Sequence, residues 1–106
     1  MNNNLQTMMT AEKRSLIKNY EPLLKLAATK IYVKADDVAP YLGSNAFDIR
    51  HACLDRQDQG GFPFFAAGKD RPTVKIPIVP FLRWISEVPV ITIYETIELV
   101  ASGAVA

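Results

Sequence analysis

The chain has 106 residues, of which 49% are hydrophobic and 22% are charged, and its formal net charge is +1. This length predicts one domain, and the apolar content excludes a globally disordered chain. One cysteine excludes an internal disulfide, the N-terminus lacks the pattern of a secretory signal, and no apolar run approaches the roughly 20 residues of a membrane span. We therefore expect a cytoplasmic protein that makes no membrane contact.

The first helix is expected directly after a disordered N-terminal segment, residues 1–9, so that residues 10–106 form the single domain. Thr10 is a candidate N-cap, and apolar residues recur at helical spacing from Leu16 to Ala27. Pro22 lies inside this pattern, which predicts either a kink or the start of a second helix. We expect the helix to pack on the rest of the domain, with a partner-binding helix as the alternative.

Two short helices are predicted after an extended stretch at residues 31–33. Asp36 or Asp37 is a candidate cap for the first of them. Its inward side chains are expected to be Val38, Ala39 and Leu42. Gly43 then supplies the positive φ that a tight turn between two helices favours.

The second short helix is predicted from about Ala46 to Arg56, with Ser44 or Asn45 as its cap. Its inner side chains are expected to be Ile49, Ala52 and Cys53. Two short helices joined by a glycine-containing turn are typical of a helix-turn-helix.

A hairpin is predicted next, because residues 62–67 are apolar and aromatic, residues 68–72 have turn composition, and residues 73–76 form a return strand that Pro77 ends. Its aromatic side chains are expected to pack under the helices, with stacking on single-stranded bases as the alternative: Phe62, Phe64 and Phe65. Pro80 fits the first turn of a further helix. That helix carries Phe81, Leu82, Trp84 and Ile85.

The C-terminal tail, residues 88–106, fits both helical and extended structure. Its apolar residues recur at helical spacing, yet Val90 to Ile93 is rich in β-branched residues, which favour a strand. We expect a helix that begins near Val90. Several apolar side chains of the tail predict either a homodimer contact or packing on the N-terminal helix: Ile93, Ile97, Val100 and Val105.

Five short motifs, in this order, carry a family resemblance: VAPYLG at residues 38–43, Ile49-Arg50, GFP at 61–63, KIP at 75–77 and FLRW at 81–84. The chain resembles the excisionase-like, MerR-type winged helix-turn-helix proteins of phages and mobile elements, and the match covers residues 33–85. The resemblance implies a mostly α fold with a small β-hairpin wing, extended here by an N-terminal helix and a C-terminal helical tail. It also implies a double-stranded DNA-binding protein, either an excisionase-like architectural factor or a transcriptional regulator.

In this family the helix at residues 45–56 enters the major groove, and the hairpin wing contacts the DNA backbone. By resemblance, the DNA-binding residues are Ser44, Asn45, Phe47, Asp48, Arg50 and His51 on the helix, and Lys69, Arg71 and Lys75 on the wing. Arg50 is suited to guanine, and Asp48 either to cytosine or to orienting Arg50. In the alternative interpretation, Ser44 and Asn45 only cap the helix and Arg50 forms a surface salt bridge.

No enzyme is expected, since the sequence contains neither a Gly-rich phosphate loop nor a triad motif. With one histidine and one cysteine, a zinc site of ordinary composition cannot form within one subunit. We therefore expect no catalytic residue, metal, cofactor or small-molecule ligand. The alternative function is a phage or mobile-element adaptor that keeps the fold without binding DNA, because the segment from Lys30 to Arg83 has a net charge of only +2.

Overall fold

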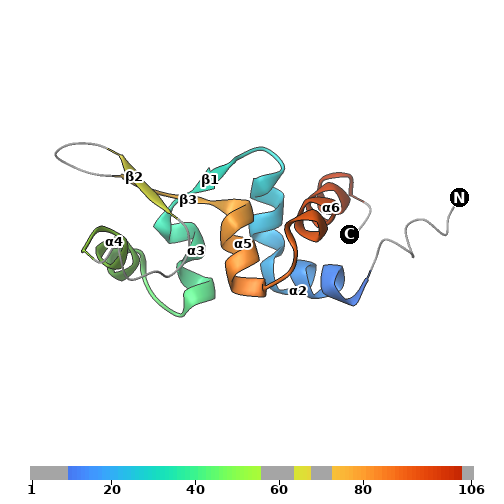
Figure 1. The fold of residues 1–106 in the computed structure, drawn as a ribbon, viewed down its shortest axis with the longest axis horizontal. Helices are drawn as coiled ribbons and strands as arrows, with labels where there is room; N and C mark the ends of the chain where they lie inside the picture. Colours follow the sequence, from blue (N-terminus) through green and yellow to red (C-terminus); the bar gives the residue numbers. More distant parts are fainter. Residues whose placement is uncertain (1–9, 56–63, 68–72, 104–106) are drawn as a thin grey trace, which may run out of the picture.

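The structure, a computed structural model, describes residues 10–55, 64–67 and 73–103. Its elements in chain order are α2 (Ala11–Ala27), β1 (Tyr32–Val33), α3 (Ala35–Leu42), α4 (Ala46–Asp55), β2 (Phe65–Ala67), β3 (Thr73–Pro77), α5 (Ile78–Ser86) and α6 (Val90–Ala101). The described chain is therefore mostly helical with a small antiparallel sheet, as predicted (Figure 1). The segment predicted to be disordered, residues 1–9, lies outside the described residues.

Helix α2 begins and bends where the sequence predicts. The backbone N–H of Lys13 donates to Oγ1 of Thr10 at 3.3 Å, so Thr10 is the N-cap. The helix kinks at Tyr20, where φ is −133° and ψ is 23°, two residues before Pro22. A proline removes one backbone hydrogen bond and crowds the preceding turn, which explains the kink. Both alternatives for Pro22 are met, because two helical segments join at this kink and Pro22 lies near the start of the second one.

The sheet has three short antiparallel strands in the order β1-β3-β2. Val33 pairs with Ile76, and both side chains are buried, as is that of Val74, so one face of the sheet covers the core. The predicted first strand of the hairpin is shorter than expected: β2 begins at Phe65, and Phe64 precedes it, half-buried against the core. Residues 62 and 63 lie outside the described part of the chain.

The core joins helices from both ends of the chain. Helices α2 and α6 pack against each other, and α5 contacts both of them and β3. The largest fully buried side chains are Phe81, Leu16, Leu23, Leu24, Ile76, Ile78, Leu82, Ile93, Val38 and Thr96. Burial of this apolar area is the main stabilising contribution to such a fold.

Helix α6 confirms the helix predicted from Val90, which ends at Ala101. Ile93, Ile97 and Val100 are all buried in the core of their own chain, where α6 packs on α2. For these three side chains the structure therefore agrees with packing on the N-terminal helix and not with a homodimer contact. Val105 lies outside the described residues. A homodimer through the tail would therefore need other side chains.

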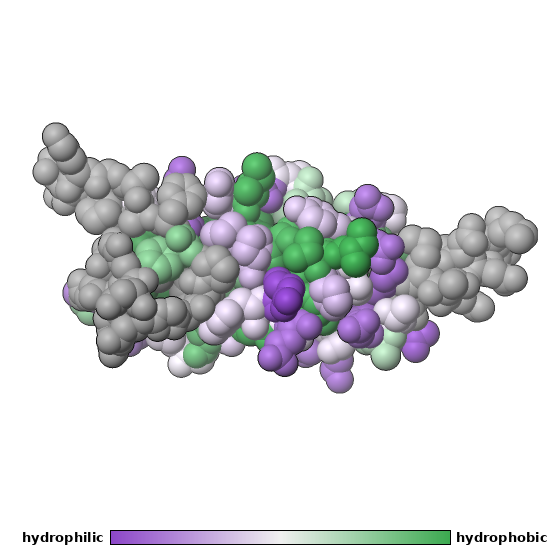
Figure 2. Space-filling view, viewed as in Figure 1, coloured by the Kyte–Doolittle hydropathy of each residue, from purple (hydrophilic) through white to green (hydrophobic). Residues whose placement is uncertain are grey.

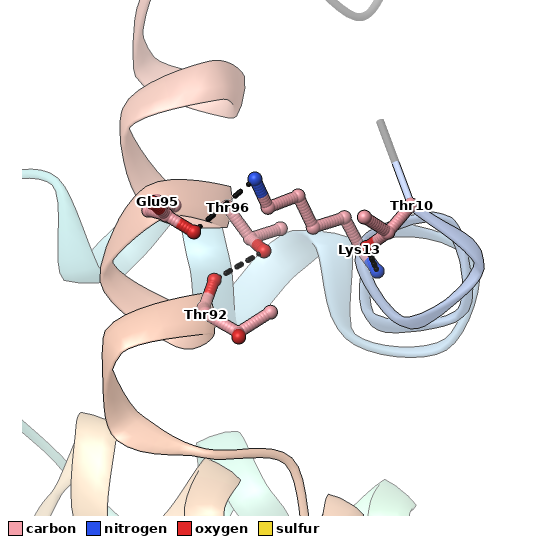
Figure 3. Close-up of polar contacts among 5 residues, drawn as sticks. All are labelled: Thr10, Lys13, Thr92, Glu95 and Thr96. Atoms are coloured by element: carbon pink, nitrogen blue, oxygen red, sulfur yellow. Dashed lines mark hydrogen bonds and ion pairs between the residues drawn. The ribbon is translucent and has the colours of Figure 1, made fainter. Parts of the chain in front are cut away.

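A lysine is buried between α2 and α6. The side chain of Lys13 is 5% exposed, and its Nζ lies 3.2 Å from Oε1 of Glu95 on α6 (Figure 3). Beside it, the buried hydroxyl of Thr96 donates to the carbonyl oxygen of Thr92 at 2.7 Å. The polar groups buried in this interface are thus paired, which is what burial of polar atoms requires.

Two tyrosines connect α2 to α3. The ring centroids of Tyr20 and Tyr41 lie 5.4 Å apart, with the ring planes tilted by 52°. Burial of the Tyr41 phenol, and secondarily the neighbouring Tyr20, raises the pKa of Tyr41 above its ordinary value.

None of the helices in residues 10–55, 64–67 and 73–103 combines the length and apolar character that crossing a membrane requires.

Candidate nucleic-acid interface

Helix α3 begins at Ala35, before both of the predicted caps, Asp36 and Asp37. Lys34 occupies the N-cap position, and Ala35, the first helical residue, is buried. Asp37 is thus the third helical residue, and its Oδ2 accepts a hydrogen bond of 3.0 Å from the backbone N–H of Lys34. The prediction that Asp36 or Asp37 caps this helix is therefore confirmed in part: Asp37 contributes to the cap, but from the third helical position and not from the N-cap position.

The turn between α3 and α4 depends on Gly43. Its φ of 62° and ψ of 34° lie in the left-handed region, as predicted. The N–H groups of Gly43 and Ser44 both donate to the carbonyl oxygen of Ala39, the second at 3.2 Å. These bonds close the end of α3 and fix the direction in which α4 departs.

Asn45 is the residue that caps α4. Its Oδ1 accepts from the backbone N–H of Asp48 at 2.9 Å, and its Nδ2 donates to Oδ2 of Asp48 at 3.0 Å. Asp48 is also favourably placed beside the positive end of the helix dipole. In the described part of the chain, no ion pair joins Asp48 to Arg50, so the carboxylate is held by Asn45 instead.

The buried and exposed sides of α4 separate as predicted where side chains are described. Ile49 is only 4% exposed and anchors the helix to the core, with Ala46 half-buried beside it. Phe47, Arg50 and His51 are exposed on the helix. The side chains of Ala52 and Cys53, also predicted to face inward, lie outside the described part.

The exposed face of α4 carries an aromatic pair. The ring centroids of Phe47 and His51 lie 4.3 Å apart, with the planes tilted by 47°. Phe47 is 62% exposed, which is unusual for a phenylalanine and leaves most of its ring available for contact. This face therefore combines an apolar ring, an imidazole and the Arg50 guanidinium.

Of the three predicted wing cations, only Lys75 lies within the described residues, and its side chain is exposed on β3. Lys69 and Arg71 lie outside them. Helix α4 contacts β3, and α4 lies with the β2–β3 hairpin at one end of the molecule, opposite α2 and α6 (Figure 1). The helix and wing segments that the sequence predicts to act together are thus neighbours.

Two cations near Lys75 were not predicted as site residues from the sequence. Lys30 and Lys34 line, together with Lys75, a pocket of about 250 Å³ where β1, β3 and the start of α3 meet. The signal that identifies them is the pairing of β1 with β3, which brings residues 30–34 beside residues 73–77. A strand of two residues has too little periodicity to reveal that pairing in advance.

No group of three or more metal-ligating side chains occurs in the part of the chain that the structure describes. Comparison of the chain with models of protein families, with curated proteins and with solved structures finds no match in any of the three.

Proposed function

We propose that the chain is a winged helix-turn-helix protein that binds double-stranded DNA. The observation that carries the proposal is the geometry of α3 and α4: a left-handed turn at Gly43, a capped second helix, and a buried anchor, Ile49, opposite an exposed face that presents Arg50. A short helix held in this way can enter the major groove with one face free.

The exposed side chains of α4 have separate proposed roles. Arg50 suits guanine, whose O6 and N7 accept both arms of a guanidinium, and the ring of Phe47 suits the methyl group of thymine. Asn45 and Asp48 act mainly as the cap of the helix, because their side chains are bonded to each other. Ser44, exposed in the turn, and His51, exposed beside Phe47, suit phosphate contacts at the edge of the groove.

The wing supplies backbone contacts in this proposal. Lys75 is exposed on β3, and Lys69 and Arg71 follow from the sequence alone. Phosphate contacts from these cations would fix the orientation of the protein on the duplex without reading sequence. An excisionase-like architectural factor or a transcriptional regulator would both use such an arrangement.

The proposal is tested by fluorescence anisotropy with a labelled random-sequence duplex, comparing the wild-type protein with two variants. Arg50→Ala removes the proposed base contact, and Arg14→Ala removes an arginine that is also exposed, on α2. We expect Arg50→Ala to weaken binding about tenfold or more, and Arg14→Ala to leave it unchanged. Equal affinity of all three proteins would contradict the proposal.

A second candidate is an adaptor that binds another protein, and the exposed apolar side chains near the C-terminus favour it. Figure 2 shows apolar surface over α5 and the start of α6. On α6, Ile91 is 68% and Tyr94 53% exposed, although both occupy an ordered helix. Exposed apolar side chains of this size are common at protein interfaces. Loss of partner capture in Ile91→Ser/Tyr94→Ser, without any loss of duplex binding, would support this candidate.

A further inference from the structure

The side of α4 that faces away from the core carries an aromatic ring. An α-helix turns by about 100° per residue, so Phe47 lies about 160° around the helix from the buried Ile49. Its ring is 62% exposed and contacts the imidazole of His51, with the ring centroids 4.3 Å apart. Because an apolar ring is poorly accommodated by water, Phe47 is suited to contacting an apolar group outside the chain.

Arg50 is the neighbour of Phe47 on this surface of the helix. The two residues are three positions apart, which places their Cβ atoms roughly 5–6 Å from each other. The side chain of Arg50 is exposed, and in the described part of the chain no carboxylate pairs with it. Helix α4 therefore presents an apolar ring and a guanidinium side by side.

The charge of α4 limits what this helix contributes to DNA binding. It contains one arginine and two aspartates, Asp48 and Asp55, so its formal charge is −1. Its attraction for the phosphate backbone is therefore weak, and most of its contribution has to come from base edges. Asp48 is hydrogen bonded to Asn45 as part of the helix cap. Base contacts by α4 thus depend chiefly on Phe47 and Arg50.

The major groove offers a matching pair of groups. The apolar group that a base edge presents there is the C5-methyl group of thymine, and 5-methylcytosine carries the same methyl group at the same position. Guanine presents O6 and N7, which accept both arms of a guanidinium. Consecutive base pairs lie about 3.4 Å apart, and the long stem of an arginine lets two neighbouring side chains of a helix contact two consecutive pairs.

We infer that α4 recognises a step of two base pairs in which a 5-methylpyrimidine lies next to guanine. Phe47 contacts the methyl group, and Arg50 donates to O6 and N7 of the guanine. The inference rests on the DNA-binding function proposed above and adds the chemical class of base that the helix selects. Thymine and 5-methylcytosine belong to this class, whereas uracil and unmethylated cytosine do not.

The test begins with selection of bound sites from random-sequence duplex DNA by the full wild-type chain. We expect the enriched sites to share a thymine in the base pair next to a guanine. Each such thymine is then replaced singly by deoxyuridine, which removes the methyl group and keeps every hydrogen-bonding group of the base. We expect one of these replacements to weaken binding about fourfold or more, the effect of losing one buried methyl group.

Protein variants show whether Phe47 makes this contact. Phe47→Ala should bind the thymine and deoxyuridine duplexes equally, and Phe47→Leu, which keeps an apolar side chain, should retain part of the difference. Tyr94→Ala removes a ring that is 53% exposed on α6, and this matched control should retain all of it. Thermal unfolding is recorded for each variant. The wild-type result does not depend on the folding of any variant, because the methyl group is removed from the DNA.

The guanine contact is tested in the same way. Replacing the guanine with 7-deazaguanine removes the N7 acceptor and should weaken binding by the wild-type protein about tenfold. Arg50→Lys keeps the charge but lacks the two-armed donor, so 7-deazaguanine should affect this variant much less. An equal loss in both proteins would show that Arg50 does not read this guanine.

A further arm separates the two sources of the methyl group. Duplexes with 5-methylcytosine or cytosine at the sensitive position are compared, and we expect the methylated duplex to bind the wild-type protein about fourfold more tightly. Phe47→Ala should bind both equally. A difference between thymine and deoxyuridine without one between 5-methylcytosine and cytosine would assign the contact to thymine alone.

Three results would overturn the inference and leave DNA binding intact: selection that enriches no such step, deoxyuridine duplexes that bind as tightly as thymine duplexes, or an undiminished methyl effect in Phe47→Ala. Wild-type protein that binds no duplex at low salt would instead contradict the proposed function itself. The two failures are therefore distinguishable in one set of measurements.

Discussion

The side chain of Asn45 is bonded twice to Asp48 across the first turn of α4, accepting from its backbone N–H at 2.9 Å and donating to its carboxylate at 3.0 Å. Both residues belong to the set predicted to contact DNA, and these bonds assign them first to holding the helix. A base contact by either side chain would have to break or share one of them. Arg50 has no such competing bond within the described residues, so it carries the proposed base recognition.

Asn45→Ala is expected to lower the free energy of unfolding by about 1 kcal/mol, because the N–H of Asp48 loses its acceptor at the end of the helix. Asn45→Ser retains an acceptor and should recover most of the loss. Ser44→Ala, at the neighbouring exposed position, serves as the control and should change little. Urea unfolding followed by circular dichroism measures all three, and equal stability of Asn45→Ala and the wild type would show that this cap is not important.

The ion pair between Lys13 and Glu95 allows a prediction of how each partner affects the free energy of unfolding. Glu95→Gln removes the partner and leaves a buried charge, so it should lower the free energy of unfolding by about 1 kcal/mol, a value reduced because Glu95 is 45% exposed. Lys13→Met keeps the apolar stem and removes the charge, so it should cost less. Adding Glu95→Gln to Lys13→Met should have almost no further effect in the same denaturation experiment. A full additional loss would mean that Glu95 stabilises the fold independently of Lys13.

Glu87 is a non-glycine residue in the left-handed region, with φ of 61°, at the end of α5. Its N–H donates to the carbonyl of Arg83 at 2.9 Å, which a glycine there would also do. Glu87→Gly should therefore raise the free energy of unfolding by about 1 kcal/mol, since it relieves an unfavourable backbone conformation. Gly43→Ala, at a position with φ of 62°, should instead lower the free energy of unfolding. Thermal unfolding of the two variants checks both predictions.

The raised pKa of Tyr41 predicts that the folded state loses stability at alkaline pH. Burial, and then Tyr20, raises its pKa above the ordinary value of 10.0, so the folded state favours the protonated phenol. The contribution of the protonated Tyr41 phenol to the free energy of unfolding is therefore complete below about pH 10, and it is lost as the pH rises through the higher pKa of the folded state. Tyr41→Phe should flatten this alkaline decline, and Tyr94→Phe, on the exposed face of α6, should not. Identical pH profiles for wild type and Tyr41→Phe would contradict the assignment.

Elements that depend on local chemistry could be predicted from the sequence. Thr10, Gly43 and Asn45 each act through backbone groups within a few residues, so residue type and spacing were sufficient. The start of α6 at Val90 was also predicted, because its helical spacing outweighed its β-branched residues.

Features that depend on contacts distant in sequence could not be predicted. Lys13 is buried only because α6 covers it, more than 80 residues along the chain. The N-cap of α3 was expected at Asp36 or Asp37, whereas the helix begins at Ala35, whose side chain is buried in the core. The positions of Lys30 and Lys34 near Lys75 depend on the pairing of β1 with β3, and a strand of two residues is too short to predict that pairing.

The most direct test of the central claim is the affinity of the wild-type protein for random-sequence duplex DNA between about 50 and 200 mM salt. About four phosphate contacts by the wing and α4 predict that log K falls linearly with log salt, with a slope of roughly −4. Absence of binding at the lowest salt, or an affinity that does not change with salt, would contradict the claim that this chain binds DNA.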